Sequence, residues 1–436
     1  MERKEIKSLV DWKNKNNRMP LVMKGARQVG KTWLLKTFGQ QFYQQVAYIN
    51  FETSSGMKQV FKNDFNLNRI LLAIQVETGI LPNENTLIIF DEIQECPEAL
   101  LALKYFYETA PQFHVVSAGS LLGVTLSNQA SFPVGKVEFL DLYPLNFTEF
   151  LNAAGQESLV RLLESGDWDL TNSYKEKFKQ YLRYYYFIGG MPEAVFSFSQ
   201  KSDFQLVREI HNKILSSYEF DFAKHIPVSI LAGVRLVWNI IPSQLAKENR
   251  KFIFKNIRQG ARAKDYEMAI IWLLDSGLIY KINNVDKVSV PLKVYENFNA
   301  FKLFVLDIGL LGAMVNLDIS ALNEADNVLE EYKGSLTEQF VMQEIQSMRR
   351  SKPYYWSLPN SQAELDFLIE HKSNIIPIEV KAAENLQSKS LKSFYQKYNP
   401  KLSIRCSMSD YRNEGWLVNL PLYAVSRLYA VIEEGV

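Results

Sequence analysis

The chain has 436 residues, 47% of them hydrophobic and 22% charged, and its formal net charge is +1. Such a composition indicates an ordinary globular protein of about two to four domains, and it excludes a disordered chain or a uniformly basic, nucleic-acid-coated surface. The two cysteines and four histidines lack the spacing of a disulfide framework or a zinc site. The start has no apolar signal region, and no 18-residue apolar run follows. We therefore expect a cytoplasmic protein without a membrane segment.

The first predicted elements are a short buried strand over residues 19–24 and a helix that begins near residue 32. The loop between them fits G-x-x-x-x-G-K-[ST], a pattern that binds phosphate through backbone N–H groups at a helix N-terminus. We expect Lys31 to contact the β- and γ-phosphates of ATP and the Thr32 hydroxyl to bind Mg²⁺. The alternative is a glycine turn with an unrelated lysine. The residues predicted to bind the nucleotide are Gly25, Ala26, Arg27, Gln28, Val29, Gly30, Lys31 and Thr32.

Further strands complete a doubly wound sheet over residues 1–150. The apolar run at residues 86–90 predicts a buried strand, and Asp91 and Glu92 follow it where parallel strands open into a ligand crevice. We expect Asp91 to bind Mg²⁺ through water and Glu92 to polarise the attacking water. The alternative for both is a helix N-cap. At the end of another strand, Ser117 or Ser120 is a candidate contact for the γ-phosphate, or simply part of a turn.

Residues 151–225 have helical periodicity, and we interpret them as a helical lid or linker. Their aromatic-rich segment at 181–187 has the spacing of a helix core, which favours packing over base stacking. The sequence Ile-Gly-Gly-Met-Pro at 188–192 predicts the end of that helix.

Residues 226–318 have the element order of a winged helix. Helices are predicted at 229–241, 243–257 and 264–276, followed by strands at 278–282 and 292–295 around a polar turn, the candidate wing. A basic stretch overlaps this region, because residues 224–264 hold nine cations and one acid, Glu248. This predicts contact with DNA phosphates, whereas the alternatives are a solvated face or a surface that binds acidic parts of the same chain. The nine cations are Lys224, Arg235, Lys247, Arg250, Lys251, Lys255, Arg258, Arg262 and Lys264.

Residues 319–436 hold a second group of acids. A helix is expected to open at Ser335, with Glu338 in a capping box. Two strands follow at 364–369 and 375–381. Alternation places Glu364 and Asp366 on one face of the first strand, and it likewise places Glu379 and Lys381 on one face of the second.

Paired as a hairpin, these strands would have the layout of the D…(D/E)-x-K nucleases. We predict that Asp366 and Glu379 bind Mg²⁺ and that Lys381 orients the attacking water, with all three catalytic. The alternative is a cross-strand salt-bridge cluster on a solvated sheet face.

Nearly the whole chain resembles a family of bacterial and archaeal ATPases with an AAA+-type P-loop domain, a winged helix and a restriction-endonuclease-like domain of unknown function. Relatives usually have an arginine after a glycine before the last strand of the first domain, where this chain has Lys136 after Gly135. The resemblance implies slow hydrolysis, or a different cation at the γ-phosphate, if that arginine acts on ATP, because lysine lacks the bidentate fork. The segments that carry the resemblance are 25–32, 88–92, 118–120, 142–150, 189–192, 306–311 and 364–381.

The expected fold is α/β, with a P-loop NTPase doubly wound parallel sheet followed by the helical region, the winged helix and a restriction-endonuclease-like α/β domain. We expect Mg²⁺-dependent ATP hydrolysis whose nucleotide state is transmitted through the helical region to a DNA-binding, and in one interpretation DNA-cleaving, C-terminal region. The alternative is an ATP-dependent regulatory switch that binds protein partners and has an inactive nuclease-like domain. Whether a homo-oligomer forms and supplies an arginine to the ATP site stays open.

Overall fold

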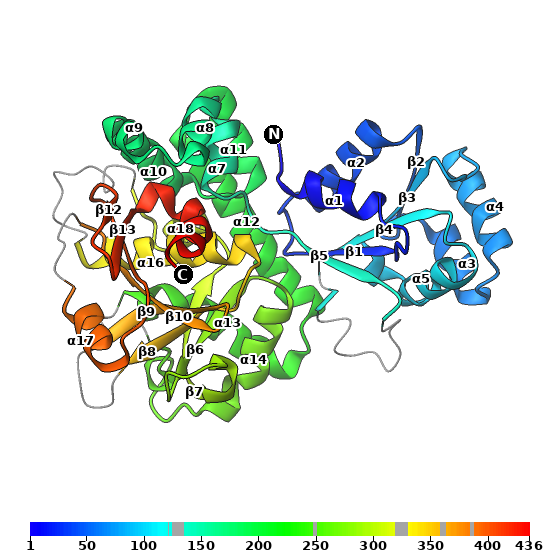
Figure 1. Cartoon of the computed structure of the whole chain (residues 1–436). Coiled ribbons are helices and arrows are strands. Elements are labelled where there is room, and N and C mark those ends of the chain that lie inside the picture. Colours follow the sequence, from blue (N-terminus) through cyan, green and yellow to red (C-terminus); the bar gives the residue numbers. More distant parts are fainter. Residues whose placement is uncertain (121, 124–134, 247–250, 319–329, 358–362, 384–387) are drawn as a thin grey trace. The chain divides into compact units, whose positions relative to one another are not determined.

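The computed structural model describes all residues except 121, 124–134, 247–250, 319–329, 358–362 and 384–387, and only the backbone of 330–332. The described chain divides into two compact units (Figure 1). The N-terminal unit comprises residues 2–143 and 275–278, and the C-terminal unit comprises residues 144–274 and 279–436 together with Met1.

The N-terminal unit is built on a parallel five-stranded sheet with the order β2-β3-β4-β1-β5. Its inner strand β3, between β2 and β4, is buried at all six positions, which explains its continuous apolar run. Figure 1 shows α1 and α2 on one face of this sheet and α3 and α5 on the other. The mixed α/β prediction with a parallel sheet is therefore confirmed. The elements are α1 (Glu5–Lys13), β1 (Leu21–Lys24), α2 (Lys31–Phe42), β2 (Gln45–Asn50), α3 (Ser55–Asn63), α4 (Leu67–Thr78), β3 (Thr86–Asp91), η1 (Ile93–Glu95), α5 (Pro97–Thr109), β4 (His114–Gly119) and β5 (Glu138–Asp141).

The C-terminal unit contains an eight-stranded mixed sheet with the order β12-β13-β11-β10-β9-β8-β6-β7. Its strands are β6 (Ile279–Val285), β7 (Glu296–Val305), β8 (Tyr354–Ser357), β9 (Glu364–His371), β10 (Asn374–Val380), β11 (Ser403–Ser407), β12 (Arg412–Asn413) and β13 (Leu417–Pro421). The first predicted wing strand, β6, and the predicted nuclease strands β9 and β10 share this sheet, joined where β6 pairs with β8 at Asn284 and Tyr355.

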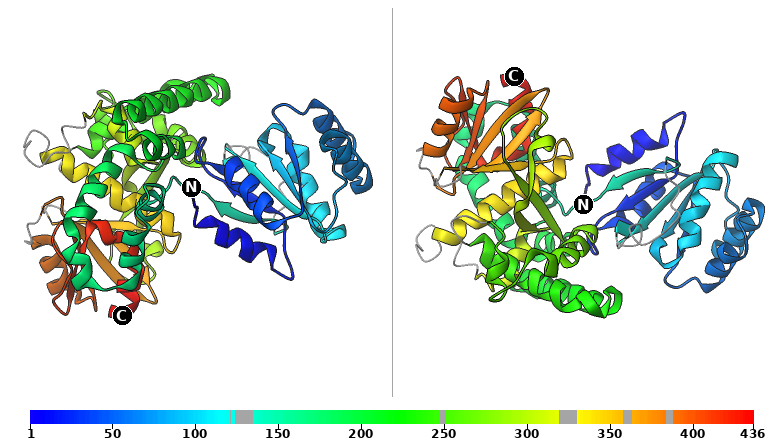
Figure 2. Two further views of the ribbon diagram at one scale, coloured as in Figure 1. Left: turned by 90° about the horizontal axis from the view of Figure 1, so that it is seen from above. Right: turned by 90° about the horizontal axis from the view of Figure 1, so that it is seen from below.

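Helices cover this sheet (Figure 2). On β9, Glu364 contacts a lysine that also binds α16, while the neighbouring Leu365 belongs to an apolar cluster with Leu391 and Phe394 of α17. At the start of β9 these neighbouring side chains therefore lie on opposite faces of the strand, Glu364 toward α16 and Leu365 toward α17. The helices are α7 (Phe147–Ala153), α8 (Glu157–Ser165), α9 (Trp168–Ser173), α10 (Lys175–Ile188), α11 (Pro192–Lys201), α12 (Phe204–His225), α13 (Val228–Leu245), η2 (Phe254–Asn256), α14 (Ala263–Asp275), η3 (Leu292–Tyr295), α15 (Ile308–Met314), α16 (Glu330–Met348), α17 (Lys389–Tyr398), η6 (Leu422–Arg427) and α18 (Leu428–Gly435).

The buried polar side chains of α16 hold three separate segments together. Gln339 Oε1 accepts a hydrogen bond from Val305 N at 3.0 Å, Gln343 Oε1 from Ile308 N at 2.9 Å, and Glu344 Oε1 from Phe147 N at 2.8 Å. Each bond satisfies a backbone donor that would be costly to bury alone. Phe147 from the predicted ATPase region, and Val305 and Ile308 from the predicted winged-helix region, therefore bind one helix of the predicted nuclease-like region, and the boundaries at residues 150, 225 and 318 stay predictions.

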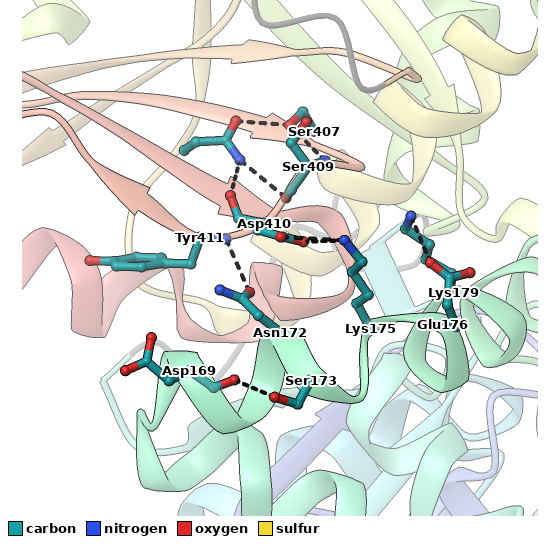
Figure 3. A network of polar contacts seen from close by, with 11 residues as sticks. Asp169, Asn172, Ser173, Lys175, Glu176, Lys179, Ser407, Ser409, Asp410 and Tyr411 are labelled. Carbon is teal, nitrogen blue, oxygen red and sulfur yellow. Dashed lines mark hydrogen bonds and ion pairs between the residues drawn. The ribbon is translucent and has the colours of Figure 1, made fainter.

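A second contact joins α9 and α10 to the edge of the sheet (Figure 3). Lys175 Nζ lies 3.2 Å from a carboxylate oxygen of Asp410, and Asn172 Oδ1 accepts a hydrogen bond from Tyr411 N at 3.3 Å. The Trp168 ring stacks on Tyr411 with centroids 4.0 Å apart. These contacts fix the helices of the predicted lid or linker region on the C-terminal sheet.

Three predicted elements differ from the structure. No separate helix spans the described residues of the expected helix 243–257: residues 243–245 end α13, Phe254–Asn256 form the short helix η2, and the Gln244 side chain binds both the N–H and the carbonyl of Ile253. The strand expected at 292–295 is the short helix η3, and Leu292 N donates to Glu370 Oε2 at 2.7 Å instead of to a strand. The second strand of the hairpin is β7, one segment later.

The capping box at Ser335 is also wrong. Helix α16 begins at Glu330, so Ser335 and Glu338 lie inside it. The Ser335 hydroxyl donates to the Leu245 carbonyl at 2.7 Å, and the Glu338 carboxylate binds Lys302. A serine followed three residues later by glutamate resembles a helix start, but here tertiary partners take both side chains.

One helix in the described part of the chain, α13 (Val228–Leu245), is long and apolar enough by length and composition to cross a membrane. Its mean hydropathy is 1.3, and 39% of that window is buried inside the protein. A core helix of a soluble protein meets the same criterion, so the expected absence of a membrane segment stays a prediction.

Candidate functional site

The glycine-rich loop connects β1 to α2, and Gly30 caps the helix with φ of 95°. Gly25 has φ of 152°, and a Cβ there would collide with the Leu142 carbonyl oxygen, so both glycines are needed for the loop conformation. The Lys31 side chain is buried, and its Nζ donates to Gly25 O at 2.9 Å and to Ala26 O at 2.7 Å. Loop backbone and lysine thus lie together as expected for a phosphate-binding loop, and phosphate binding there stays a prediction.

Burial lowers the pKa of Lys31 to about 8, and the carboxylates of Glu92 and Asp91 oppose that shift. The ammonium is therefore present at neutral pH, although it lies away from water. A bound phosphate would supply the negative charge that this cation lacks at close range.

Asp91, at the end of β3, brings together the predicted magnesium ligands. Its Oδ2 accepts hydrogen bonds from the Thr32 hydroxyl at 2.7 Å and from the Tyr48 hydroxyl at 2.9 Å. A carboxylate and a hydroxyl are oxygen ligands of the kind Mg²⁺ takes alongside water and phosphate. The residues present therefore fit the metal. Tyr48, on β2, was not singled out in the sequence because a tyrosine in a strand is usually a packing residue.

Glu92, the predicted general base, has a left-handed backbone with φ of 49°. Its Oε2 accepts a hydrogen bond from Gln94 Nε2 at 2.6 Å. Gln94 also lies against β4, since a Cβ at Gly119 would collide with Gln94 Oε1. Gln94 thus orients the Glu92 carboxylate from a position between the ends of β3 and β4, which sequence spacing did not indicate.

The two candidate serines differ in position. Ser117 is fully buried in β4, and its hydroxyl donates to the Leu21 carbonyl at 3.2 Å. Ser120 lies beside the loop, where its Oγ accepts from Arg27 Nε at 3.3 Å. A nucleotide contact by Ser117 stays a prediction. Of the two serines, Ser120 is the one whose hydroxyl hydrogen-bonds to a residue of the glycine-rich loop. Lys136, at the position where the family resemblance led us to expect an arginine, lies 3.2 Å from the Glu108 carboxylate.

The basic stretch separates into paired and exposed cations. Arg235 lies 3.2 Å from Glu219, and Lys251 Nζ donates to Ser357 Oγ at 3.1 Å. Lys247 and Arg250 lie outside the described residues. The exposed cations around the start of α14 are Lys255, Arg258, Arg262 and Lys264.

The predicted nuclease hairpin is formed by β9 and β10, which pair antiparallel with Phe367 opposite Ile378. Asp366 Oδ2 accepts a hydrogen bond from Val380 N at 2.7 Å. Lys381 Nζ lies 2.9 Å from Glu379 Oε1. The structure thus brings Asp366, Glu379 and Lys381 to one end of the hairpin, and each has an interaction within the protein.

The other two acids of this region share a cation that the sequence analysis missed. Lys302 on β7 is fully buried, and its Nζ lies 2.9 Å from Glu338 Oε1 and 2.7 Å from Glu364 Oε1. No sequence signal connects these three positions, because they lie on two strands and a helix that are far apart along the chain. In the described residues, no group of three or more His, Cys, Asp and Glu side chains is placed to share a metal ion.

Comparisons with known proteins agree with the N-terminal geometry. A family model described as "AAA domain" matches residues 17–151. The N-terminal unit has an AAA-type ATPase-like fold. Two models described as domains of unknown function, DUF8612 and DUF4143, match residues 179–321 and 333–423. Among curated proteins, no relative matches the chain.

The solved structures that match the chain include three from archaea and bacteria. The Walker-type ATPase PABY2304 of Pyrococcus abyssi is 15% identical over 72% of this chain and 95% of its own, with a TM-score of 0.44. The ORC1 protein of Aeropyrum pernix in complex with DNA is 10% identical over 72% and 91%, with a TM-score of 0.27. The RuvB branch migration motor of Thermotoga maritima is 12% identical over 64% and 89%, with a TM-score of 0.29. At these TM-scores the likenesses carry no argument about this chain.

Proposed function

We propose that the N-terminal unit binds ATP with Mg²⁺ and hydrolyses it. The observation that carries this proposal is the direct contact of Thr32 with Asp91 beside the buried Lys31, because these are the three groups that an ATP–magnesium complex requires. Thr32 and Asp91 would hold the ion, which when bound neutralises charge on the phosphates. Lys31 would contact the phosphates, and Glu92, oriented by Gln94, would position the attacking water.

The test is ATP turnover by the full chain in the presence of Mg²⁺ or a chelator. Lys31→Ala is expected to lose nucleotide binding, whereas Glu92→Gln is expected to bind nucleotide and turn it over at least about a hundredfold more slowly. Lys62→Ala, an exposed lysine in α3, is the matched control and should behave as wild type. Turnover that survives both Lys31→Ala and Glu92→Gln would disprove the assignment.

We propose a second function, DNA binding, for the exposed cations around the start of α14. Four cations within ten residues of chain give the local positive charge that phosphate contacts need, although the net charge of the protein is only +1. Arg258→Glu combined with Arg262→Glu should weaken DNA binding and reduce its salt dependence by about two phosphate contacts. Lys177→Glu combined with Lys201→Glu makes the same charge change on other exposed helices and should have little effect. Equal affinity of both double variants for DNA would refute the proposal.

Two proposals compete for the C-terminal carboxylates. Cleavage requires Asp366 and Glu379 to bind Mg²⁺ while Lys381 acts on the water, and it predicts metal-dependent nicking of supercoiled DNA that Asp366→Ala and Lys381→Ala abolish. The regulatory switch that binds protein partners is favoured by the ion pairs, because Lys302 already pairs with both Glu338 and Glu364 and Lys381 pairs with Glu379. A wild type that turns over ATP and binds DNA but never nicks it in Mg²⁺ or Mn²⁺ would support the switch.

A further inference from the structure

A short segment from the second half of the chain packs against the glycine-rich loop. Residues 275–278 belong to the N-terminal unit, although they join α14 to β6, whose other residues belong to the C-terminal unit. A Cβ added at Gly277 would lie 3.3 Å from Ala26 N and 3.8 Å from Ala26 Cα. The segment also packs closely against Gly123, since a Cβ there would collide with the Asp275 carbonyl oxygen. Ser276 and Leu278 are buried, so the whole segment is held in place.

Asp275 of the same segment interacts electrostatically with Lys24, the residue before the loop. Burial raises the pKa of Asp275, and the ammonium of Lys24 opposes that shift. Lys24 is the last residue of β1 and directly precedes Gly25. The segment thus meets the loop twice, through the Asp275 charge near Lys24 and through the backbone of Gly277 on Ala26.

The peptide group between Gly25 and Ala26, which Gly277 contacts, also accepts a hydrogen bond from Lys31, and we expect that bond to change when phosphate binds. Lys31 Nζ donates to the carbonyls of Gly25 and Ala26. An ammonium that turns to the β- and γ-phosphates withdraws from those carbonyls, so the backbone at Ala26 loses its partner where Gly277 packs. A nucleotide bound by Lys31 would therefore act on residues 275–278 through one peptide group.

We propose that residues 275–278 are part of the nucleotide site, with Gly277 as a positioning residue for the loop, and that they transmit nucleotide state to α14 and β6. This inference rests on the proposed nucleotide binding. It differs from transmission through the helices of residues 151–225, because four residues connect the loop directly to a helix and a strand. The exposed cations Arg262 and Lys264 lie at the start of that helix, so the same element reaches the proposed DNA-binding surface.

Two glycines with nearly the same φ make it possible to distinguish the effect of the contact with Ala26 from the strain of an alanine in a left-handed backbone conformation. Gly277 has φ of +74°, and Gly79, which ends α4 in the same unit, has φ of +75°. Nothing lies within 4 Å of a Cβ at Gly79. Alanine therefore meets the same left-handed strain at both positions, but only at Gly277 does it also push against Ala26.

The first experiment measures binding of fluorescent ADP and of a non-hydrolysable fluorescent ATP analogue, with Mg²⁺, by the full chain. Gly277→Ala is expected to weaken nucleotide affinity by about fivefold or more, within the usual range of coupling between sites. Gly79→Ala is expected to match wild type in affinity, with a melting temperature as low as that of Gly277→Ala. Equal nucleotide affinity of the two variants would overturn the inference.

The second experiment uses wild-type protein and so does not depend on the folding of a variant. Hydrogen exchange is compared with and without the non-hydrolysable ATP analogue. We expect slower exchange in the glycine-rich loop and an altered rate in peptides covering 274–279. Protection of the loop with no change at 274–279 would refute the coupling while nucleotide binding stands. No protection anywhere, together with no binding of the analogue, would refute the proposed function and with it the inference.

Discussion

Replacing Lys302 by methionine should destabilise the C-terminal unit strongly. The change leaves Glu338, which is fully buried, and Glu364, whose side chain is 19% exposed, without the ammonium that lies 2.9 and 2.7 Å from them. Removing one partner of a buried ion pair costs about 3–5 kcal/mol, because the remaining charge is buried without compensation. At about 2 °C per kcal/mol for a unit of this size, the melting temperature should fall by about 6–10 °C.

The size of the loss should depend on which partner is removed. Glu338→Gln keeps Lys302 beside Glu364, so its cost should be smaller, about 1–3 kcal/mol. Lys302→Met combined with Glu338→Leu removes the fully buried charges together and leaves only Glu364, which reaches water. We expect this double variant to be more stable than Lys302→Met alone, because replacing a whole buried pair by apolar groups is often neutral.

The assay is thermal and urea unfolding of wild type, Lys302→Met, Glu338→Leu and the double variant, with Glu338→Gln measured beside them, followed by tryptophan fluorescence, since five of the seven tryptophans lie in the C-terminal unit. The decisive quantity is the interaction term of the double-mutant cycle. If the losses of Lys302→Met and Glu338→Leu simply add, the two side chains are not coupled and the argument from burial fails. A Lys302→Met protein as stable as wild type would refute it more directly.

Three further predictions follow from the nucleotide site and the core. Gln94→Leu should leave ATP affinity unchanged but lower turnover about tenfold or more, because Glu92 loses the hydrogen bond that orients it. Nucleotide affinity should be constant below pH 8 and should fall above pH 8 by at most about tenfold per pH unit. The reason is that bound phosphate favours the ammonium form of Lys31, which is lost above its pKa of about 8. Affinity titrations between pH 7 and 9.5 would show the fall. Asp307→Ala should cost about 2–5 kcal/mol in unfolding experiments, because the buried N–H groups of Gly190 and Leu310 lose their acceptor.

The residues proposed for the nucleotide site could be chosen from the sequence because the chemistry they would supply is local. Eight consecutive residues form the loop, and Asp91 and Glu92 follow a strand whose apolar run is visible without any tertiary information. Hydrophobic patterning could not show Tyr48 and Gln94, since their roles depend on which strand ends lie side by side.

In the C-terminal half, prediction failed where a distant side chain took over a backbone group. The alternating apolar residues at 292–295 looked like a strand, but Glu370 accepts the Leu292 N–H, and the ladder with β6 is formed by residues 296–305. The serine and glutamate of the expected capping box bind Leu245 and Lys302 instead. Lys302 itself looked like an ordinary charged residue of a strand. Only the fold brings it within reach of two acids.

The hydrogen bonds of the carboxylates favour one residue as the place to test for a metal ion at the C-terminal sheet. Glu338 and Glu364 share Lys302, and Asp366 accepts a backbone N–H, so a cation would have to displace an existing partner at each. Glu379 differs, because its Oε1 binds Lys381 while its buried Oε2 has no hydrogen-bond partner among the described residues. A buried carboxylate oxygen without a partner is costly unless something binds it. Loss of metal binding in Glu379→Gln, but not in Glu364→Gln, would therefore indicate a built site rather than general attraction to acidic residues.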